Sequence, residues 1–68
     1  MTDKEKKLHE YVKSLQRIEL LMAEAQAAFN VGAYDENRAK MELNTLRLKE
    51  LMHARCDVMA SYYHTLAN

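Results

Sequence analysis

Apolar residues recur along the first half of the chain in steps of three and four, the spacing of one face of an α-helix. The series keeps a heptad pattern without a break and comprises Leu8, Tyr11, Leu15, Ile18, Met22, Ala25 and Phe29. This pattern, typical of coiled coils, predicts a long amphipathic helix over residues 3–31. Thr2 and Glu5 have the spacing of a capping box, so we expect the helix to begin directly after Thr2.

The second half of the chain carries a wide apolar face that predicts a helix over residues 36–66. The expected members of this face are Met41, Leu48, Leu51, Met52, Val58, Met59, Tyr62 and Leu66, with Thr45 and Cys56 at its edge. Asp35 is the expected N-cap of this helix. Asn44 and Arg55 interrupt the face. Such polar residues can fix a register or an oligomeric state, or they can extend their polar ends to water; we expect the second role for Arg55, and both roles stay open for Asn44.

The only glycine, Gly32, lies between the two predicted helices, and the chain contains no proline. A glycine commonly ends a helix by adopting a left-handed conformation, so we expect Gly32 to close the first helix and residues 32–35 to form the turn. A short connection places two helices side by side and antiparallel. The predicted fold is therefore all-α, with one domain over residues 1–68 that consists of two long helices in a hairpin.

The segment 25–36 contains Phe29, Gly32, Tyr34 and Asp35 around the predicted turn. With these residues it resembles the inter-helix turn of tetratricopeptide repeats and related helical hairpins. No second repeat follows, and such repeats need about three copies or more to form a stable stack. The resemblance therefore implies shared turn chemistry and no membership of that family.

A second set of apolar residues lies off these two faces, in the half of each helix that is next to the turn. This turn-half set comprises Leu20, Ala23, Ala27, Val31, Ala39, Leu43 and Leu46. Two helices cover only one face of each other, and burial of one leucine is worth about 1.5–3 kcal/mol. A single chain of 68 residues is also marginally stable. We therefore expect self-association through this set, at the turn end, most simply as a homodimer that forms an antiparallel four-helix bundle.

Charge and cysteine content restrict the possible functions. Ten acidic and ten basic side chains cancel, whereas proteins that bind phosphate backbones usually carry a net basic field. An RNA- or DNA-binding helical bundle is therefore the alternative rather than the first hypothesis. The charged first residues and the lack of a long apolar run predict neither a signal peptide nor a membrane span. The lone Cys56 suits a reducing compartment, so we expect a cytoplasmic location.

Candidate chemistry is sparse. Glu50 and His53 have the Glu-x-x-His spacing of carboxylate-bridged metal sites in helical bundles. Their row lies away from Leu48 and Met52, so we expect a solvated face that binds no metal, and a metal-binding bundle is the second alternative. No catalytic set is evident, because a nucleophilic cysteine such as Cys56 would need a positioned base and an electropositive pocket. We expect no enzyme activity and no cofactor.

The candidate contacts for another protein lie in the half of the second helix that is distant from the turn. They are Tyr63, His64, His53 and Asp57. Tyrosine is enriched at interfaces because it combines a large apolar ring with a polar tip. The expected function is that of a small protein-interaction or regulatory module, such as a bacterial or phage accessory protein, whose partners are a second copy of itself and another protein.

Overall fold

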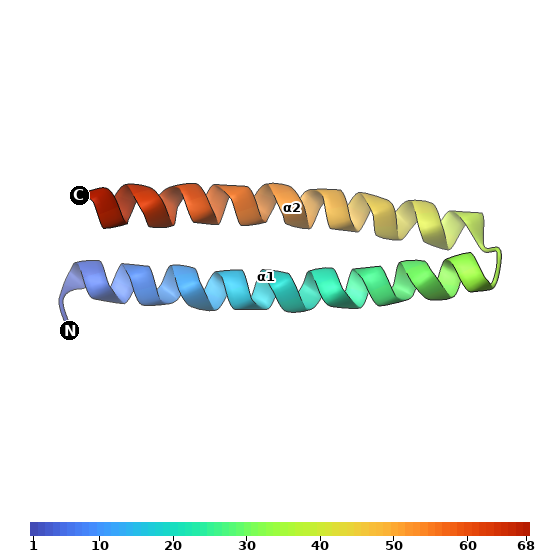
Figure 1. Cartoon of the computed structure of the whole chain (residues 1–68), viewed down its shortest axis with the longest axis horizontal. Helices are drawn as coiled ribbons and strands as arrows, with labels where there is room; N and C mark the ends of the chain where they lie inside the picture. The colour runs from blue at the N-terminus through green and yellow to red at the C-terminus, as the bar shows by residue number, and fades with distance from the viewer.

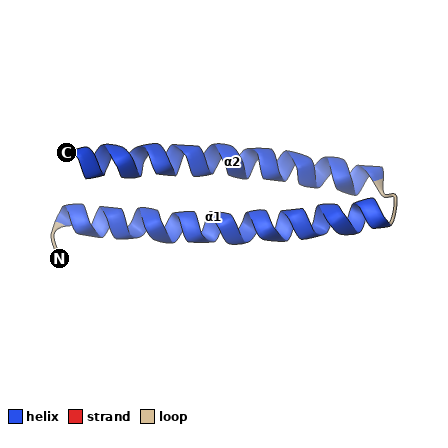
Figure 2. Ribbon diagram, viewed as in Figure 1, coloured by secondary structure: helices blue, strands red, loops and turns tan.

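The computed structural model describes residues 1–68 as two long α-helices joined by a short turn (Figure 1). Helix α1 spans Asp3–Tyr34 and helix α2 spans Arg38–Ala67, and the chain contains no strand (Figure 2). The helices lie side by side and antiparallel, so both ends of the chain lie at the same end of the hairpin. The prediction of an all-α hairpin of two packed helices is confirmed.

The first helix begins where the capping box predicts. The Thr2 side chain accepts a hydrogen bond from the backbone N–H of Glu5, with 3.2 Å between the two heavy atoms. Asp3 and Glu5 lie in the first turn, where their negative charges interact favourably with the positive end of the helix dipole.

The turn lies three residues later than predicted, because α1 continues through Gly32 to Tyr34. The left-handed residue is Glu36, with a φ of 55°, and Gly32 has no positive φ. Two hydrogen bonds close the helix: the N–H of Glu36 donates to the carbonyl of Ala33 (3.2 Å), and the N–H of Asn37 donates to that of Gly32 (2.7 Å). This is the pattern of a Schellman ending with Glu36 in the position that glycine usually occupies.

The N-cap of α2 also differs from the prediction. Asn37 caps the helix, and its side-chain oxygen accepts the backbone N–H of Lys40 at 3.1 Å. Asp35, the expected cap, instead follows the last residue of α1 and donates its N–H to the carbonyl of Val31 at 2.9 Å. The expected bounds of 3–31 and 36–66 therefore become 3–34 and 38–67.

Gly32 serves close packing rather than a special backbone conformation. It is buried against α2, and a Cβ atom added to it would lie 3.2 Å from both Cβ and Cγ of Lys40 and 3.4 Å from Cγ of Met41. Ala25, one heptad earlier, is fully buried, and Ala28 is half-buried. Small residues on α1 therefore let the two helices approach closely in the half of the hairpin next to the turn.

The seam between the helices follows the predicted heptad series on α1, where all seven members are buried or half-buried. On α2 the prediction is wrong for Met52 and Leu66, which are 55% and 49% exposed. The seam repeats every 3.5 residues on average, and these two side chains lie beside it rather than on it. Ala54 and Thr65 are half-buried instead.

Asn44 is buried in the seam and bonds within its own helix. Its Nδ2 donates to the carbonyl of Lys40 at 2.8 Å, and its Oδ1 lies 3.5 Å from Nη1 of Arg47. Both partners belong to α2, so these bonds do not tie the register of α2 to α1. Arg55 is exposed, in agreement with the expectation that it extends to water.

The hairpin is a single layer of two helices that measures 50 × 17 × 11 Å. Ala25 is the only fully buried hydrophobic residue. Stable domains usually bury their apolar stripes between two packed layers, so the hairpin has two broad faces that no second layer covers. Neither helix combines the length and the apolarity needed to cross a bilayer.

Candidate interaction surface

Large hydrophobic side chains are exposed along the whole hairpin. They are Met1, Val12, Leu20, Val31, Tyr34, Leu43, Leu46, Met52, Tyr63 and Leu66. Single surface leucines are common in proteins, but here the exposed large hydrophobic residues greatly outnumber the one hydrophobic residue that is buried. The surface of the hairpin is therefore where a binding role is best sought.

All seven residues of the turn-half set are exposed in the isolated hairpin, as the sequence predicts. Leu20 and Leu43, for example, are 61% and 59% exposed. Most members lie on the side of their helix that is turned away from the seam, at opposite edges of the hairpin. Val31 and Leu43 instead share the heptad rows of Glu24 and Glu50, which lie on one broad face. No single flat surface contains all seven residues, so the structure does not bring them together as one patch.

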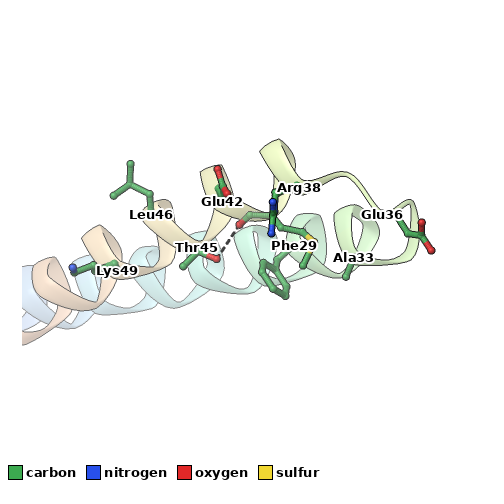
Figure 3. A pocket seen from close by; sticks show the side chains of 9 residues that line it. Phe29, Ala33, Glu36, Arg38, Glu42, Thr45, Leu46 and Lys49 are labelled. Atoms are coloured by element: carbon green, nitrogen blue, oxygen red, sulfur yellow. Dashed lines mark hydrogen bonds between the residues drawn. The ribbon is translucent and has the colours of Figure 1, made fainter.

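A continuous groove runs along one broad face, which we call the grooved face. Neighbouring stretches of this groove share the lining residues Phe29, Thr45, Lys49 and Met52. The largest stretch has a volume of about 580 Å³ and lies beside the turn (Figure 3). It is lined by Phe29, Ala33, Glu36, Arg38, Met41, Glu42, Thr45, Leu46 and Lys49. From there the groove follows α2 past Met52 to Cys56.

The groove has an apolar floor and a charged rim. The floor includes Phe29 of α1 and Met41 of α2, both half-buried. The Thr45 hydroxyl donates to the carbonyl of Met41 at 2.9 Å, which leaves the threonine methyl group to line the groove (dashed line in Figure 3). Glu42 and Leu46 point away from α1 at the outer rim. An apolar centre with a polar rim is the usual composition of a protein–protein interface.

The opposite broad face has a different character. Its central depression is lined by Leu21, Arg47, Glu50, Leu51 and Ala54, and it shares no residue with the groove. Charged residues also occupy more of the heptad rows on this side. They are Asp3, Lys7, Glu10, Arg17, Glu24, Lys40, Arg47, Glu50 and Asp57, compared with Glu5, Glu19, Arg38, Glu42 and Lys49 on the rows of the grooved face and Glu36 in the turn beside it. Burial of the grooved face therefore costs less desolvation free energy than burial of the opposite face.

The Glu-x-x-His pair is exposed and divided between the two faces. Glu50 borders the depression on the opposite face, whereas His53 borders the far stretch of the groove next to Cys56. No group of three or more His, Cys, Asp or Glu side chains lies together in an arrangement that could hold a metal ion.

The four candidate partner contacts are exposed but do not form one patch. The ring of Tyr63 packs edge-to-face on that of Tyr62, with 5.5 Å between centroids and 82° between planes. His64 lines a polar depression at the open end of the hairpin, together with Lys4 and Lys7 of α1. His53 and Asp57 lie one turn apart, closer to the middle of α2.

The floor of the groove consists of residues that the sequence assigns to the core or its edge. Phe29 and Met41 are on the seam, but a single neighbouring helix leaves part of each side chain uncovered. Thr45 and Met52 occupy the same heptad row of α2, beside the seam. That row is the feature of the sequence that could have indicated the groove. The groove itself forms only because the row of α1 that contains Gln26 and Ala33 lies next to it.

The comparisons with known proteins identify no relative. No protein-family model, no curated protein and no solved structure matches this chain. The function is therefore inferred from the chemistry of the surface itself.

Proposed function

We propose that this protein is a non-enzymatic helical interaction module that associates with itself. The observation that carries the proposal is the exposed area. The hairpin has an accessible surface of 5387 Å², whereas a compact monomer of its mass, 7.9 kDa, exposes about 4,400 Å². The excess of about 1,000 Å² is close to the roughly 800 Å² that each partner buries in a protein–protein interface of standard size.

The shape of the hairpin supports the same proposal. Its radius of gyration is 15.5 Å, compared with about 11 Å for a compact domain of 68 residues. Burial of each large exposed side chain is worth about 1.5–3 kcal/mol, so a second layer would stabilise a chain that has almost no enclosed core. A pair of hairpins stacked face to face is a four-helix bundle, which is the simplest assembly that supplies this layer.

Self-association through one broad face leaves other surface free for a second protein. His64 and Asp57 lie outside the grooved face and would stay exposed in such a pair. The proposed role is thus that of a small regulatory protein, in which a rigid dimer presents helix surfaces to its partner. The balanced net charge favours a protein partner over nucleic acid.

Sedimentation equilibrium tests the proposal directly. We expect the purified chain at micromolar concentration to sediment with twice the mass of one chain and to be fully helical by circular dichroism. The same protein at lower concentrations provides the control, because a specific dimer dissociates reversibly into monomers on dilution. A fully helical monomer throughout the micromolar range would contradict the proposal.

A further inference from the structure

The two broad faces differ in the number of large hydrophobic side chains that they leave exposed. Val12 lies two heptads before Gln26, in the same row of α1, and Leu66 lies two heptads after Met52 in the same row of α2. With Leu46 at its rim and Tyr63 two heptads after Lys49, the grooved face holds five of the ten exposed large hydrophobic residues, whereas the rows of the opposite face hold two, Val31 and Leu43. It also carries fewer charges than the opposite face, so its burial removes more apolar and less charged surface from water.

We infer that a second copy of this chain docks across the grooved face, with Met52 near the centre of the contact. The inference rests on the proposed self-association and adds the surface through which it occurs. Met52 is 55% exposed and lies at the middle of α2, within the stretch of the groove between Phe29 and Cys56. Among the large hydrophobic side chains of this face, only Tyr63, near the open end, is more exposed than Met52.

The area of the face fits a second copy. A face of 50 × 17 Å has a projected area of about 850 Å², which is of the same order as the roughly 800 Å² that each partner buries in a standard interface. A second hairpin has the same length and the same flat shape, so it covers the face from end to end. A shorter partner would leave one end of the face in water, with Val12 near the open end or Ala33 near the turn uncovered.

The charges around the groove also fit a second copy. Glu36 and Glu42 are acidic and Arg38 and Lys49 are basic, so the rim beside the turn has both signs in equal number. Two identical faces related by a twofold axis can therefore place opposite charges across from each other. A rim of a single sign would repel its own copy and would fit an oppositely charged partner instead.

This assignment differs from association through the turn-half set, of which only Leu46 borders the groove. Leu43 is nine residues from Met52, which is two and a half helical turns, so the two side chains point to opposite sides of α2. Both are exposed large aliphatic side chains on the same helix, at 59% and 55%. They form a matched pair that distinguishes a contact on the grooved face from a contact on the far side of α2.

The test compares the variants Met52→Glu and Leu43→Glu by sedimentation equilibrium, with circular dichroism to verify that each remains helical. We expect Met52→Glu to raise the dissociation constant of the dimer at least about tenfold, and Leu43→Glu to change it less than about threefold. If Leu43→Glu weakens the dimer as much as or more than Met52→Glu, the inference is wrong but the proposed function stands. If the unmodified chain is a monomer, both are wrong.

Cross-linking through the native cysteine gives an independent measurement that does not depend on how Met52→Glu folds. Cys56 is exposed and lines the groove beside Met52. A short bis-maleimide should convert most of the unmodified chain to a covalent dimer. The double variant Cys56→Ser/Glu50→Cys, which moves the thiol to the opposite face, should give little. Equal yields from the two proteins, or a higher yield from the relocated thiol, would overturn the inference.

Discussion

Glu36 is the residue under most local strain, because it holds a positive φ of 55° without being glycine. A side chain in the left-handed region costs roughly 1–2 kcal/mol, since its Cβ approaches the following carbonyl oxygen. The strain is maintained by the two closing hydrogen bonds from the N–H groups of Glu36 and Asn37 to α1. The sharp reversal of the chain therefore depends on a residue that is poorly suited to its own conformation.

Replacing Glu36 by glycine should consequently stabilise the protein. We expect Glu36→Gly to raise the free energy of unfolding by about 0.5–1 kcal/mol, because relief of the strain outweighs the extra flexibility of the unfolded chain. Urea denaturation at one protein concentration measures the change. The control is Asp35→Gly, since Asp35 has an ordinary φ of −82° and gains nothing from glycine. Equal losses in both variants would show that strain at Glu36 is unimportant.

The cap of α2 leads to a second prediction at the same scale. Asn37→Ala should lower the free energy of unfolding by about 1 kcal/mol, because the backbone N–H of Lys40 loses its acceptor. Asp35→Ala should have a smaller effect, because Asp35 does not cap α2. Thermal melts followed by circular dichroism compare the two variants. A larger loss of stability from Asp35→Ala than from Asn37→Ala would show that Asp35 is the N-cap of α2.

These two sites show how far residue-scale patterns could be predicted. The Thr2 cap was accessible from the sequence because it depends only on the spacing of Thr2 and Glu5 along one helix. The predicted turn is misplaced because Gly32 is the residue type that usually adopts a positive φ, and the sequence does not reveal that its small size instead allows close contact with α2. With Gly32 inside the helix, the left-handed position passes to Glu36.

At the scale of the helices, the close approach beside the turn depends on the size of the residue at position 32. A Cβ atom at this position would lie only 3.2 Å from two atoms of Lys40, and one of the two is the Cβ of Lys40, which moves only with the backbone of α2. A larger side chain would therefore push the helices apart rather than displace a flexible chain end.

We expect Gly32→Leu to lower the free energy of unfolding by about 1–3 kcal/mol. Gly32→Ala should change it by less than about 1 kcal/mol, because the higher helix propensity of alanine offsets the tight contact. The matched control is Ala27→Leu, an enlargement of similar size on the exposed side of the same helix, which should stay within about 0.5 kcal/mol. Chemical denaturation measures all three, and equal effects of leucine at positions 32 and 27 would contradict the role of close packing.

The element scale also limits what could be predicted of the candidate surface. The heptad series on α1 identified its buried face correctly, because one helix determines that face by itself. The sequence predicts Met52 and Leu66 in the core because they extend the apolar stripe of α2. It does not show how much of that stripe a single neighbouring helix can bury. The groove consists of rows from both helices, so its lining emerges only from their relative rotation.

For the whole molecule, the main consequence of the fold is that one layer cannot enclose a core. The hairpin is 11 Å thick, and Ala25 is its only fully buried hydrophobic residue. If a second copy supplies the missing layer, folding and association are coupled, and the stability of the protein depends on its concentration. An independently stable monomer would lack this dependence.

Thermal unfolding at several protein concentrations tests this coupling. A tenfold increase in concentration favours a dimer by about 1.4 kcal/mol, which for two cooperative chains of this size corresponds to a rise in Tm of roughly 5 °C. Met52→Glu should melt at a lower temperature and lose most of this dependence, whereas Leu43→Glu should retain it. A Tm that is constant for the unmodified chain over a hundredfold range of concentration would show that the single layer is stable alone. The exposed apolar residues of the grooved face would then have to serve a different partner.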